Sequence, residues 1–148
     1  VCARTIVVIR PDDTELAALL AADKLETVVC AAAGQGMGHS LSCAIAASAD
    51  ADGWLVALAD MPYIKPASFR CVIAALDKGA TLARPVYEGQ MGHPVGFAAT
   101  HFAALLALTG DQGGRAILEA DPAALVACPV NDPGVLKDID RPAQVGLA

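Results

Sequence analysis

The sequence lacks any apolar run of the roughly 18 residues that a membrane span needs. Although 55% of its 148 residues are apolar, charged residues, glycines and prolines interrupt every such stretch earlier. It also lacks a basic cluster, because 10 lysines and arginines are outnumbered by 16 acidic residues, for a net charge of −6. Proteins that bind a phosphate backbone concentrate positive charge. We therefore expect a soluble protein that binds neither membranes nor nucleic acid.

The 5 cysteines are an odd number, are widely spaced and include no CxxC pair. This pattern predicts neither a disulfide framework nor a zinc site. The chain begins with Val1, and no cationic region followed by an apolar run indicates a signal peptide. We expect a cytoplasmic location.

Short β-branched and apolar runs alternate with helical patterns along the chain. Predicted strands cover 5–9, 26–30, 54–59, 82–86, 94–97 and 125–130, and predicted helices start near residues 14, 41, 66, 102 and 115. The strands on either side of the 87–93 loop are suited to antiparallel pairing. The alternation predicts one α/β domain with three layers: a mostly parallel, Rossmann-like sheet with helices on both faces, and an antiparallel strand pair.

Asp60 follows six apolar residues, 54–59, directly. Ligands of such sheets bind outside the carboxyl ends of the strands, which is where this carboxylate should emerge. Mg²⁺ prefers one or two carboxylates together with substrate phosphate oxygens, so Asp60 and a partner would suffice. The alternative is that Asp60 only caps the turn before Pro62 or the helix that follows.

Asp138 and Asp140 stand two residues apart, so in an extended segment both carboxylates face one way while Ile139 points to the core. They could complete a metal site with Asp60. From spacing alone, a solvated acidic turn before Pro142 explains them better than a metal site does.

Two Gly-rich stretches, 34–40 and 110–115, lie at expected helix starts. Glycines permit close backbone approach, and free amide groups at a helix start favour anions. The first stretch fails the GxGxxG pattern of dinucleotide-binding folds and could be a flexible connection. The second ends in Arg115, which can hold a phosphate, although Asp111 could merely cap the following helix.

Five short motifs occur in order between the expected elements. They are Gly36-Met37-Gly38-His39-Ser40-Leu41, Leu58-Ala59-Asp60-Met61-Pro62, Gly92-His93-Pro94-Val95, Gly110-Asp111-Gln112-Gly113-Gly114-Arg115 and Asp138-Ile139-Asp140-Arg141-Pro142. Together they make residues 6–145 resemble the MobA-like nucleotidyltransferases, and within them the molybdenum cofactor cytidylyltransferase branch.

The resemblance implies that a nucleotidyl group, CMP or another NMP, passes from CTP or another NTP to a phosphorylated acceptor such as molybdopterin, with release of pyrophosphate. It implies Mg²⁺ as cofactor and a possible cofactor-insertion partner protein. The implied metal ligands are Asp60, Asp138 and Asp140. The implied nucleotide-binding residues are Gly36, Met37, Gly38, His39, Ser40 and Asp60. The implied acceptor-binding residues are Gly92, His93, Pro94, Gly110, Asp111, Gly113, Gly114 and Arg115. The implied catalytic residues are Asp60, His93 and Arg115.

One departure from the family concerns its opening segment. The family begins with a strand and a Gly-rich turn carrying Arg and a downstream Lys, and this sequence has no such segment. We therefore expect residues 1–148 to be a single nucleotidyltransferase domain that lacks its N-terminal strand and Gly-rich phosphate loop and is inactive alone. Two alternatives remain: a transferase of the same fold that uses GTP or a different acceptor, and a catalytically silent nucleotide-binding or regulatory domain.

Overall fold

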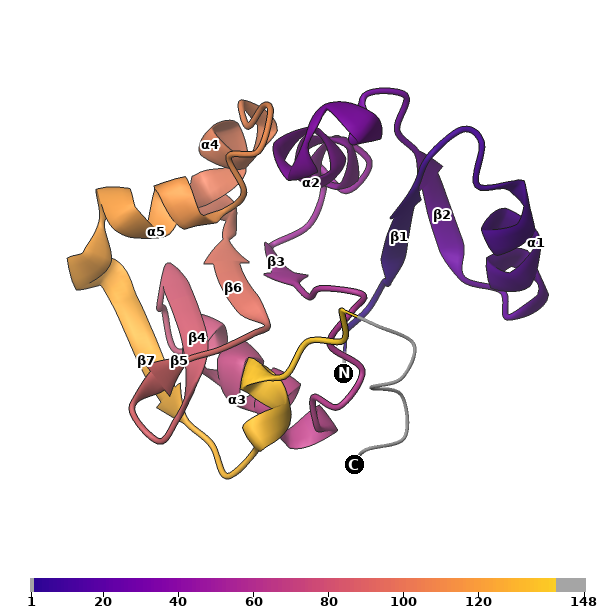
Figure 1. The fold of residues 1–148 in the computed structure, drawn as a ribbon. Coiled ribbons are helices and arrows are strands. Elements are labelled where there is room, and N and C mark those ends of the chain that lie inside the picture. The colour runs from indigo at the N-terminus through magenta and orange to yellow at the C-terminus, as the bar shows by residue number, and fades with distance from the viewer. Residues whose placement is uncertain (1, 141–148) are drawn as a thin grey trace. The chain divides into compact units, whose positions relative to one another are not determined.

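A computed structural model describes residues 2–140, which form two compact units (Figure 1). The two-strand unit comprises residues 2–51 and 101–122. The five-strand unit comprises residues 52–100 and 123–140. Each unit has its own sheet and its own buried residues.

The two-strand unit is built on a parallel strand pair joined by a helical crossover. Its elements are β1 (Ile6–Ile9), α1 (Thr14–Ala22), β2 (Glu26–Val29), the short 3₁₀ helix η1 (Ala33–Gln35), α2 (Met37–Ala46), α4 (Phe102–Leu106) and α5 (Arg115–Ala120). Helix α1 packs on β2, whereas α2 packs on β1 and on α4. The core residues Ile9, Cys30, Ile45 and Leu105 are buried.

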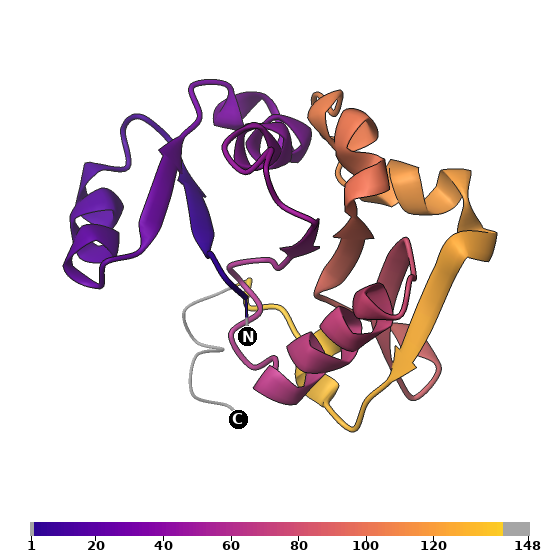
Figure 2. The same ribbon diagram turned by 180° about the vertical axis from the view of Figure 1, so that it is seen from behind.

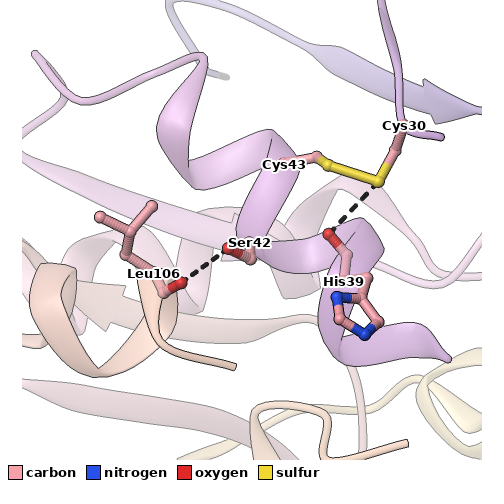
Figure 3. The surroundings of a disulfide bond; sticks show 5 residues. All are labelled: Cys30, His39, Ser42, Cys43 and Leu106. Carbon is pink, nitrogen blue, oxygen red and sulfur yellow. Dashed lines mark hydrogen bonds between the residues drawn. A yellow bond between two sulfur atoms is a disulfide. The ribbon is translucent and has the colours of Figure 1, made fainter. Parts of the chain in front are cut away.

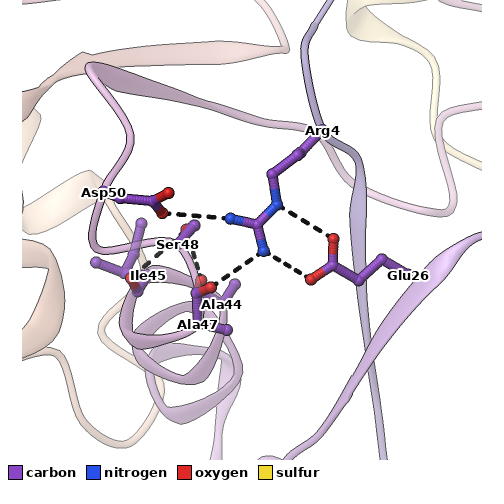
Figure 4. Close-up of polar contacts among 7 residues, drawn as sticks. All are labelled: Arg4, Glu26, Ala44, Ile45, Ala47, Ser48 and Asp50. Atoms are coloured by element: carbon purple, nitrogen blue, oxygen red, sulfur yellow. Dashed lines mark hydrogen bonds and ion pairs between the residues drawn. The ribbon is translucent and has the colours of Figure 1, made fainter.

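Arg4 holds the start of β1 to its neighbours on both sides (Figure 4). Its guanidinium donates two hydrogen bonds to the Glu26 carboxylate, at 3.2 and 2.7 Å. It donates a third to Asp50 Oδ1 at 3.3 Å and a fourth to the carbonyl of Ala47 at 3.3 Å. The forked geometry of arginine allows one side chain to join the start of β2 to the turn that follows α2.

The five-strand unit contains one longer helix and a mixed sheet. Its elements are β3 (Gly53–Val56), α3 (Pro66–Asp77), β4 (Leu82–Tyr87), β5 (Gln90–Met91), β6 (Val95–Ala98), β7 (Leu125–Pro129) and the 3₁₀ helix η4 (Pro133–Leu136). Two further 3₁₀ turns, η2 (Ala99–His101) and η3 (Pro122–Ala124), lie at the borders between the units. The sheet order is β3-β6-β4-β5, and β7 pairs with β4.

Helix α3 covers one face of this sheet and packs on β3, β4, β6 and β7 (Figure 2). Pro66 at its first turn has the backbone angle that a helix start needs and no N–H to leave unpaired. Val72 on the helix meets Ala83 on β4 and Cys128 on β7 in a cluster buried from solvent. Phe97 of β6 and Leu82 of β4 are also buried. This packing fixes the strand ends around which the candidate site is built.

The expected α/β class, with helices flanking a sheet, is confirmed, but the mostly parallel strand direction is wrong for the sheet of the five-strand unit. In the five-strand unit, β3 pairs antiparallel with β6, β6 with β4, and β4 with β5, so that only β7 runs parallel to its neighbour. The antiparallel pairing of β4 with β6 confirms the expected strand pair, and α3 lies on one face only. Strand direction depends on pairing between distant segments, which a local pattern does not encode.

The strand expected at 54–59 ends at Val56. Its last residue pairs with Val95, the first residue of β6. The preceding Pro94 has no N–H with which to extend the ladder. Asp60 therefore lies in a turn some residues beyond the strand, rather than directly at its end.

No helix within residues 2–140 is long and apolar enough to cross a bilayer.

Candidate functional site

Asp60 and the 138–140 segment lie side by side in the five-strand unit. The Ile139 N–H donates a hydrogen bond to the Asp60 carbonyl at 2.8 Å. Asp60, Asp138 and Asp140 are exposed while Ile139 is partly buried, as expected for an extended segment that alternates its side chains. The Asp60 carboxylate accepts no hydrogen bond from any described residue, so it does not cap the following helix.

A buried carboxylate, Asp132, anchors the acidic segment to the start of α3. Asp132 is 2% exposed and accepts hydrogen bonds from Ser68 Oγ at 2.6 Å, from the Lys65 amide at 2.8 Å and from the Gly134 amide at 3.0 Å. Burial acts to raise the pKa of Asp132, but these hydrogen bonds outweigh it and the net pKa is lowered. The ionised Asp132 thus fixes the path of the chain that leads to Asp138.

The β4–β5 hairpin approaches the same segment from the other side. A side chain at Gly92 would collide with Val135, so only glycine permits the close approach. Next to it, the His93 amide donates to the Val135 carbonyl at 2.9 Å. Arg84 holds the hairpin from within, because its Nε donates to the Gly92 carbonyl at 2.9 Å and its Nη2 to the Met91 carbonyl at 3.4 Å.

His93 is half buried and lies within electrostatic reach of both Asp60 and Arg84. Burial lowers the pKa of its imidazole most strongly, and the positive charge of Arg84 lowers it further. The Asp60 carboxylate raises the same pKa, but by less. A neutral imidazole is therefore favoured beside an exposed carboxylate, which suits a residue that accepts or relays a proton near neutral pH.

The carboxylates of Asp60 and the 138–140 segment suit a metal site shared with a substrate better than a closed cage of protein ligands. Within residues 2–140, no three acidic, histidine or cysteine side chains are already gathered as a cage for a metal ion. Mg²⁺ does not need such a cage, since it usually takes one or two carboxylates and completes its shell with water and phosphate oxygens. The exposed pairing of Asp60 with the 138–140 segment therefore fits a cation held jointly with a substrate. Arg141 and Pro142 of the last motif lie outside the described residues.

The two-strand unit carries a separate hollow of about 530 Å³ at the end of β1 and the start of α2. Among the residues assigned by resemblance, Gly36, Met37, Ser40 and Asp111 line it. Arg10 and Asp13 also line it, and the Arg10 amide donates to Asp13 Oδ2 at 3.1 Å. Backbone amides and a cation in an open hollow can bind a polar, anionic ligand.

The Gly36–Ser40 loop is set by a tight contact with the second Gly-rich stretch. The Gly38 amide donates to the Gly110 carbonyl at 2.7 Å. A Cβ on Gly38 would lie 2.8 Å from the Thr109 and Gln112 carbonyl oxygens, and Gly36 has a φ of 136°. The helix begins at Met37, earlier than the start expected near residue 41, and this bond satisfies one of its first amides. The resemblance-assigned residues of both stretches thus meet within one unit.

A disulfide joins Cys30 to Cys43 and ties the end of β2 to α2 (Figure 3). The expectation that the chain forms no disulfide is wrong for this pair, because the fold brings the end of a strand onto the helix that packs beside it. Cys30 Sγ also lies 3.5 Å from the carbonyl oxygen of His39. One turn later, Ser42 Oγ donates to the Leu106 carbonyl of α4 at 2.7 Å. These links fix the helix whose first turn borders the hollow.

Arg115 lies on the surface of the two-strand unit, with its side chain 87% exposed. Its Nε donates to Glu119 Oε1 at 2.6 Å, one helical turn away, and the pKa of Arg115 is raised by that hydrogen bond. Asp111 does not cap α5, since its N-cap position, Gly114, makes no side-chain cap. A surface pair of this kind opens easily, so Arg115 is available to a ligand.

The structure therefore distributes the expected residues between the units. Asp60, Gly92, His93, Pro94, Asp138 and Asp140 lie in the five-strand unit, and Gly36, Met37, Gly38, His39, Ser40, Gly110, Asp111, Gly113, Gly114 and Arg115 lie in the two-strand unit. Sequence reasoning missed Arg84 and Asp132. A charged residue inside an otherwise apolar strand is the signal for Arg84. An Asp followed by Pro-Gly, a turn pattern, is the signal for Asp132.

Comparison with known proteins identifies the family. The sequence profile of the MobA-like NTP transferase domain matches residues 1–125. The purine catabolism protein PucB of Bacillus subtilis (strain 168) is 31% identical over 122 residues, which make up 80% of this chain and 58% of PucB. The chain thus spans less than two thirds of the length of this relative.

Solved structures share the fold. A homologue of Mycobacterium tuberculosis Rv0371c from Mycobacterium sp. strain JC1 has a TM-score of 0.72 and 25% identity, covering 93% of this chain and 69% of that protein. Rv0371c from M. tuberculosis H37Rv, solved in complex with manganese, has a TM-score of 0.72 and 25% identity, covering 86% and 68%. With the profile match over most of its length and the similarity to PucB, the chain belongs to the MobA-like NTP transferase domain family.

Proposed function

We propose that this chain carries the greater part of a Mg²⁺-dependent nucleotidyltransferase. An oxygen of the acceptor's phosphate attacks the α-phosphorus of a nucleoside triphosphate, the bond between the α- and β-phosphates breaks, and pyrophosphate leaves. We favour CTP as the donor and a phosphorylated pterin such as molybdopterin as the acceptor. The observation that carries this proposal is the hydrogen bond from Ile139 to Asp60, which joins two acidic segments remote in sequence.

The residues of the five-strand unit would hold the reacting phosphates. Asp60, with Asp138 or Asp140, is suited to hold a divalent cation, and the manganese complex of the structurally similar Rv0371c protein supports this choice. When bound, Mg²⁺ neutralises the charge that builds up between two anions. His93 and the backbone of 92–94 would then orient the acceptor. Such a reaction needs no covalent intermediate, so alignment of the two substrates supplies most of the rate enhancement.

The residues of the two-strand unit would bind the nucleotide. The hollow beside β1 offers the backbone of 36–38, the Ser40 hydroxyl and the Arg10 cation. We assign the base and sugar to the Gly36–Ser40 loop, and we assign acceptor contacts to the 110–115 stretch that packs on it. A cytoplasmic location is inferred from the substrate, because nucleoside triphosphates are made there. A cofactor-insertion protein is a possible partner that receives the product.

We further propose that a strand and a Gly-rich turn bearing Arg and Lys complete the domain. Among the described strands, β1 pairs only with β2 and β3 pairs only with β6, so each leaves one edge with unpaired amide and carbonyl groups. Unpaired edges of this kind are suited to accept a further strand. The sequence contains no Gly-rich turn with Arg and Lys that could grip a triphosphate.

Pyrophosphate release tests both proposals. The chain is assayed with Mg²⁺, molybdopterin and each of the four ribonucleoside triphosphates, alone and extended at its N-terminus by a strand and Gly-rich turn. We expect release only from the extended chain, fastest with CTP, and loss of release in Asp60→Asn. Asp77→Asn, an exposed carboxylate at the end of α3, serves as the control and should retain activity.

Each other outcome overturns a named part of the proposal. Release by the unextended chain would refute the need for an added segment. Faster release with GTP would refute the CTP preference. CTP binding that is indifferent to Mg²⁺, without pyrophosphate release from either form, would refute catalysis and favour a silent nucleotide-binding domain.

A further inference from the structure

Arg84 is a half-buried cation without an acidic partner. It forms no ion pair with any residue of 2–140, and its two hydrogen bonds go to the neutral carbonyls of Met91 and Gly92. Burial lowers the pKa of its guanidinium. Placing an uncompensated charge inside a strand is costly. Neutral donors would suffice to hold the hairpin, and a bound anion would balance the positive charge of Arg84.

Hydrogen bonds connect the hairpin that holds Arg84 with the segment that leads to Asp138. Its guanidinium plane is fixed by the hairpin carbonyls, which leaves Nη1 without a described hydrogen-bond partner. His93 follows Gly92, and the charges of both Arg84 and Asp60 shift the pKa of its imidazole. The His93 amide is bonded to Val135, in the segment that leads to Asp138. The half-buried His93 therefore interacts with the positive charge of Arg84 and with the exposed carboxylate of Asp60.

We propose that Arg84 binds a phosphate group of the acceptor substrate, holding it next to the carboxylates that bind the metal. This inference rests on the proposed function, and it adds the side chain that would hold the acceptor's phosphate in place. Guanidinium and phosphate match in charge and in hydrogen-bond geometry, and a guanidinium already fixed in its plane loses little entropy on binding. The anion would complete the charge balance of Arg84.

Titration with inorganic phosphate, followed by NMR, tests the inference without any need for catalysis. We expect the amide signals of 91–93 to shift in the full chain as phosphate is added. In Arg84→Met, half-saturation should require at least about tenfold more phosphate, as expected for loss of a charge-assisted hydrogen bond. Arg70→Met, which removes an exposed arginine of α3 in the same unit, is the matched control and should titrate like the unaltered chain.

A purely structural role gives a different result. If Arg84 only holds the hairpin, Arg84→Met melts at a lower temperature but, while folded, binds phosphate with unchanged affinity, and the inference is overturned. Should Arg84→Met fail to fold, Arg84→Gln decides, because its amide can still donate to Gly92 while the charge is gone. Unchanged phosphate affinity in folded Arg84→Gln overturns the inference, and weakened affinity supports it. Failure of pyrophosphate release in the extended chain would overturn the proposed function while leaving the phosphate titration to stand or fall separately.

Discussion

Individual side chains fix the path of the segment that leads to Asp138, and Asp132 contributes most. Its carboxylate accepts three hydrogen bonds while almost fully buried, so its removal leaves the donors of Ser68, Lys65 and Gly134 without an acceptor. We expect Asp132→Ala to lower the free energy of unfolding by about 3 kcal/mol at pH 7. Chemical denaturation measures this, with Asp77→Ala as the exposed control.

The pH dependence of this effect has a definite sign. The pKa of Asp132 is lower in the folded chain than its ordinary value of about 3.9 in the unfolded chain. Its contribution to stability is therefore complete above the unfolded pKa and is lost as the pH falls through the folded pKa. The stability difference between the unaltered chain and Asp132→Asn should shrink over that acidic range. A difference that stays constant down to the lowest pH would contradict the role assigned to the ionised form.

His93 reports the two charges that flank it. Its imidazole should titrate below the ordinary value of about 6.5, since burial and Arg84 both lower its pKa. Asp60→Asn should lower the pKa further by removing the charge that raises it, whereas Arg84→Met should raise it. Proton NMR of the imidazole signals follows all three proteins. Equal pKa values in the three would show that neither charge acts on His93.

At the scale of elements, the contact between the two Gly-rich stretches sets the wall of the hollow. An alanine methyl at Gly38 would meet backbone carbonyl oxygens at 2.8 Å, and backbone cannot move aside as a flexible side chain can. We expect Gly38→Ala to destabilise the chain by about 1–3 kcal/mol, the usual cost of overpacking. Gly34→Ala is the matched control, because no atom lies within 4 Å of its added methyl. Equal stability of the two variants would contradict this packing.

The disulfide links two elements of the same unit. It closes a loop with a sequence separation of 13 residues, so its reduction should cost about 3 kcal/mol of stability in the chain-entropy account. Thermal melts with and without reductant measure this. Cys43→Ser should melt at the lower temperature and should not respond to reductant. Cys2→Ser, which removes an exposed free thiol, should respond like the unaltered chain. A melting temperature that ignores reductant in the unaltered chain would count against the bond.

Elements with a strong local pattern were predictable from sequence. The apolar runs near 6–9 and 125–129 are strands as expected, and the Pro66 start of α3 is confirmed. The end of β3 at Val56 was not predictable, because it depends on where β6 begins. The antiparallel order of the sheet and the Cys30–Cys43 bond likewise depend on which distant segments meet.

The residues of the candidate site were likewise predictable only in part. Asp60 and the 138–140 pair could be singled out by residue type and position, and a backbone hydrogen bond joins the two segments. A metal shared by their carboxylates stays a prediction. Arg84 was missed because its neighbours in β4 indicate an ordinary buried strand. Asp132 was missed because its role depends on Ser68 and Lys65, which are remote in sequence.

In the molecule as a whole, the proposed activity depends on acidic side chains from two remote segments sharing one divalent cation. Both segments belong to the five-strand unit, and the Asp60–Ile139 hydrogen bond sets them next to each other. A single carboxylate on a surface binds Mg²⁺ weakly, whereas two carboxylates and a triphosphate together supply the oxygen ligands it prefers.

The most direct test is paramagnetic broadening of backbone amide signals by Mn²⁺, added to this chain in the presence of CTP. The account predicts that signals of 59–61 and 138–140 broaden at the lowest Mn²⁺ concentrations, and that Asp60→Asn removes this preference while Asp77→Asn does not. Broadening that begins elsewhere on the acidic surface, or that is unchanged in Asp60→Asn, would contradict it.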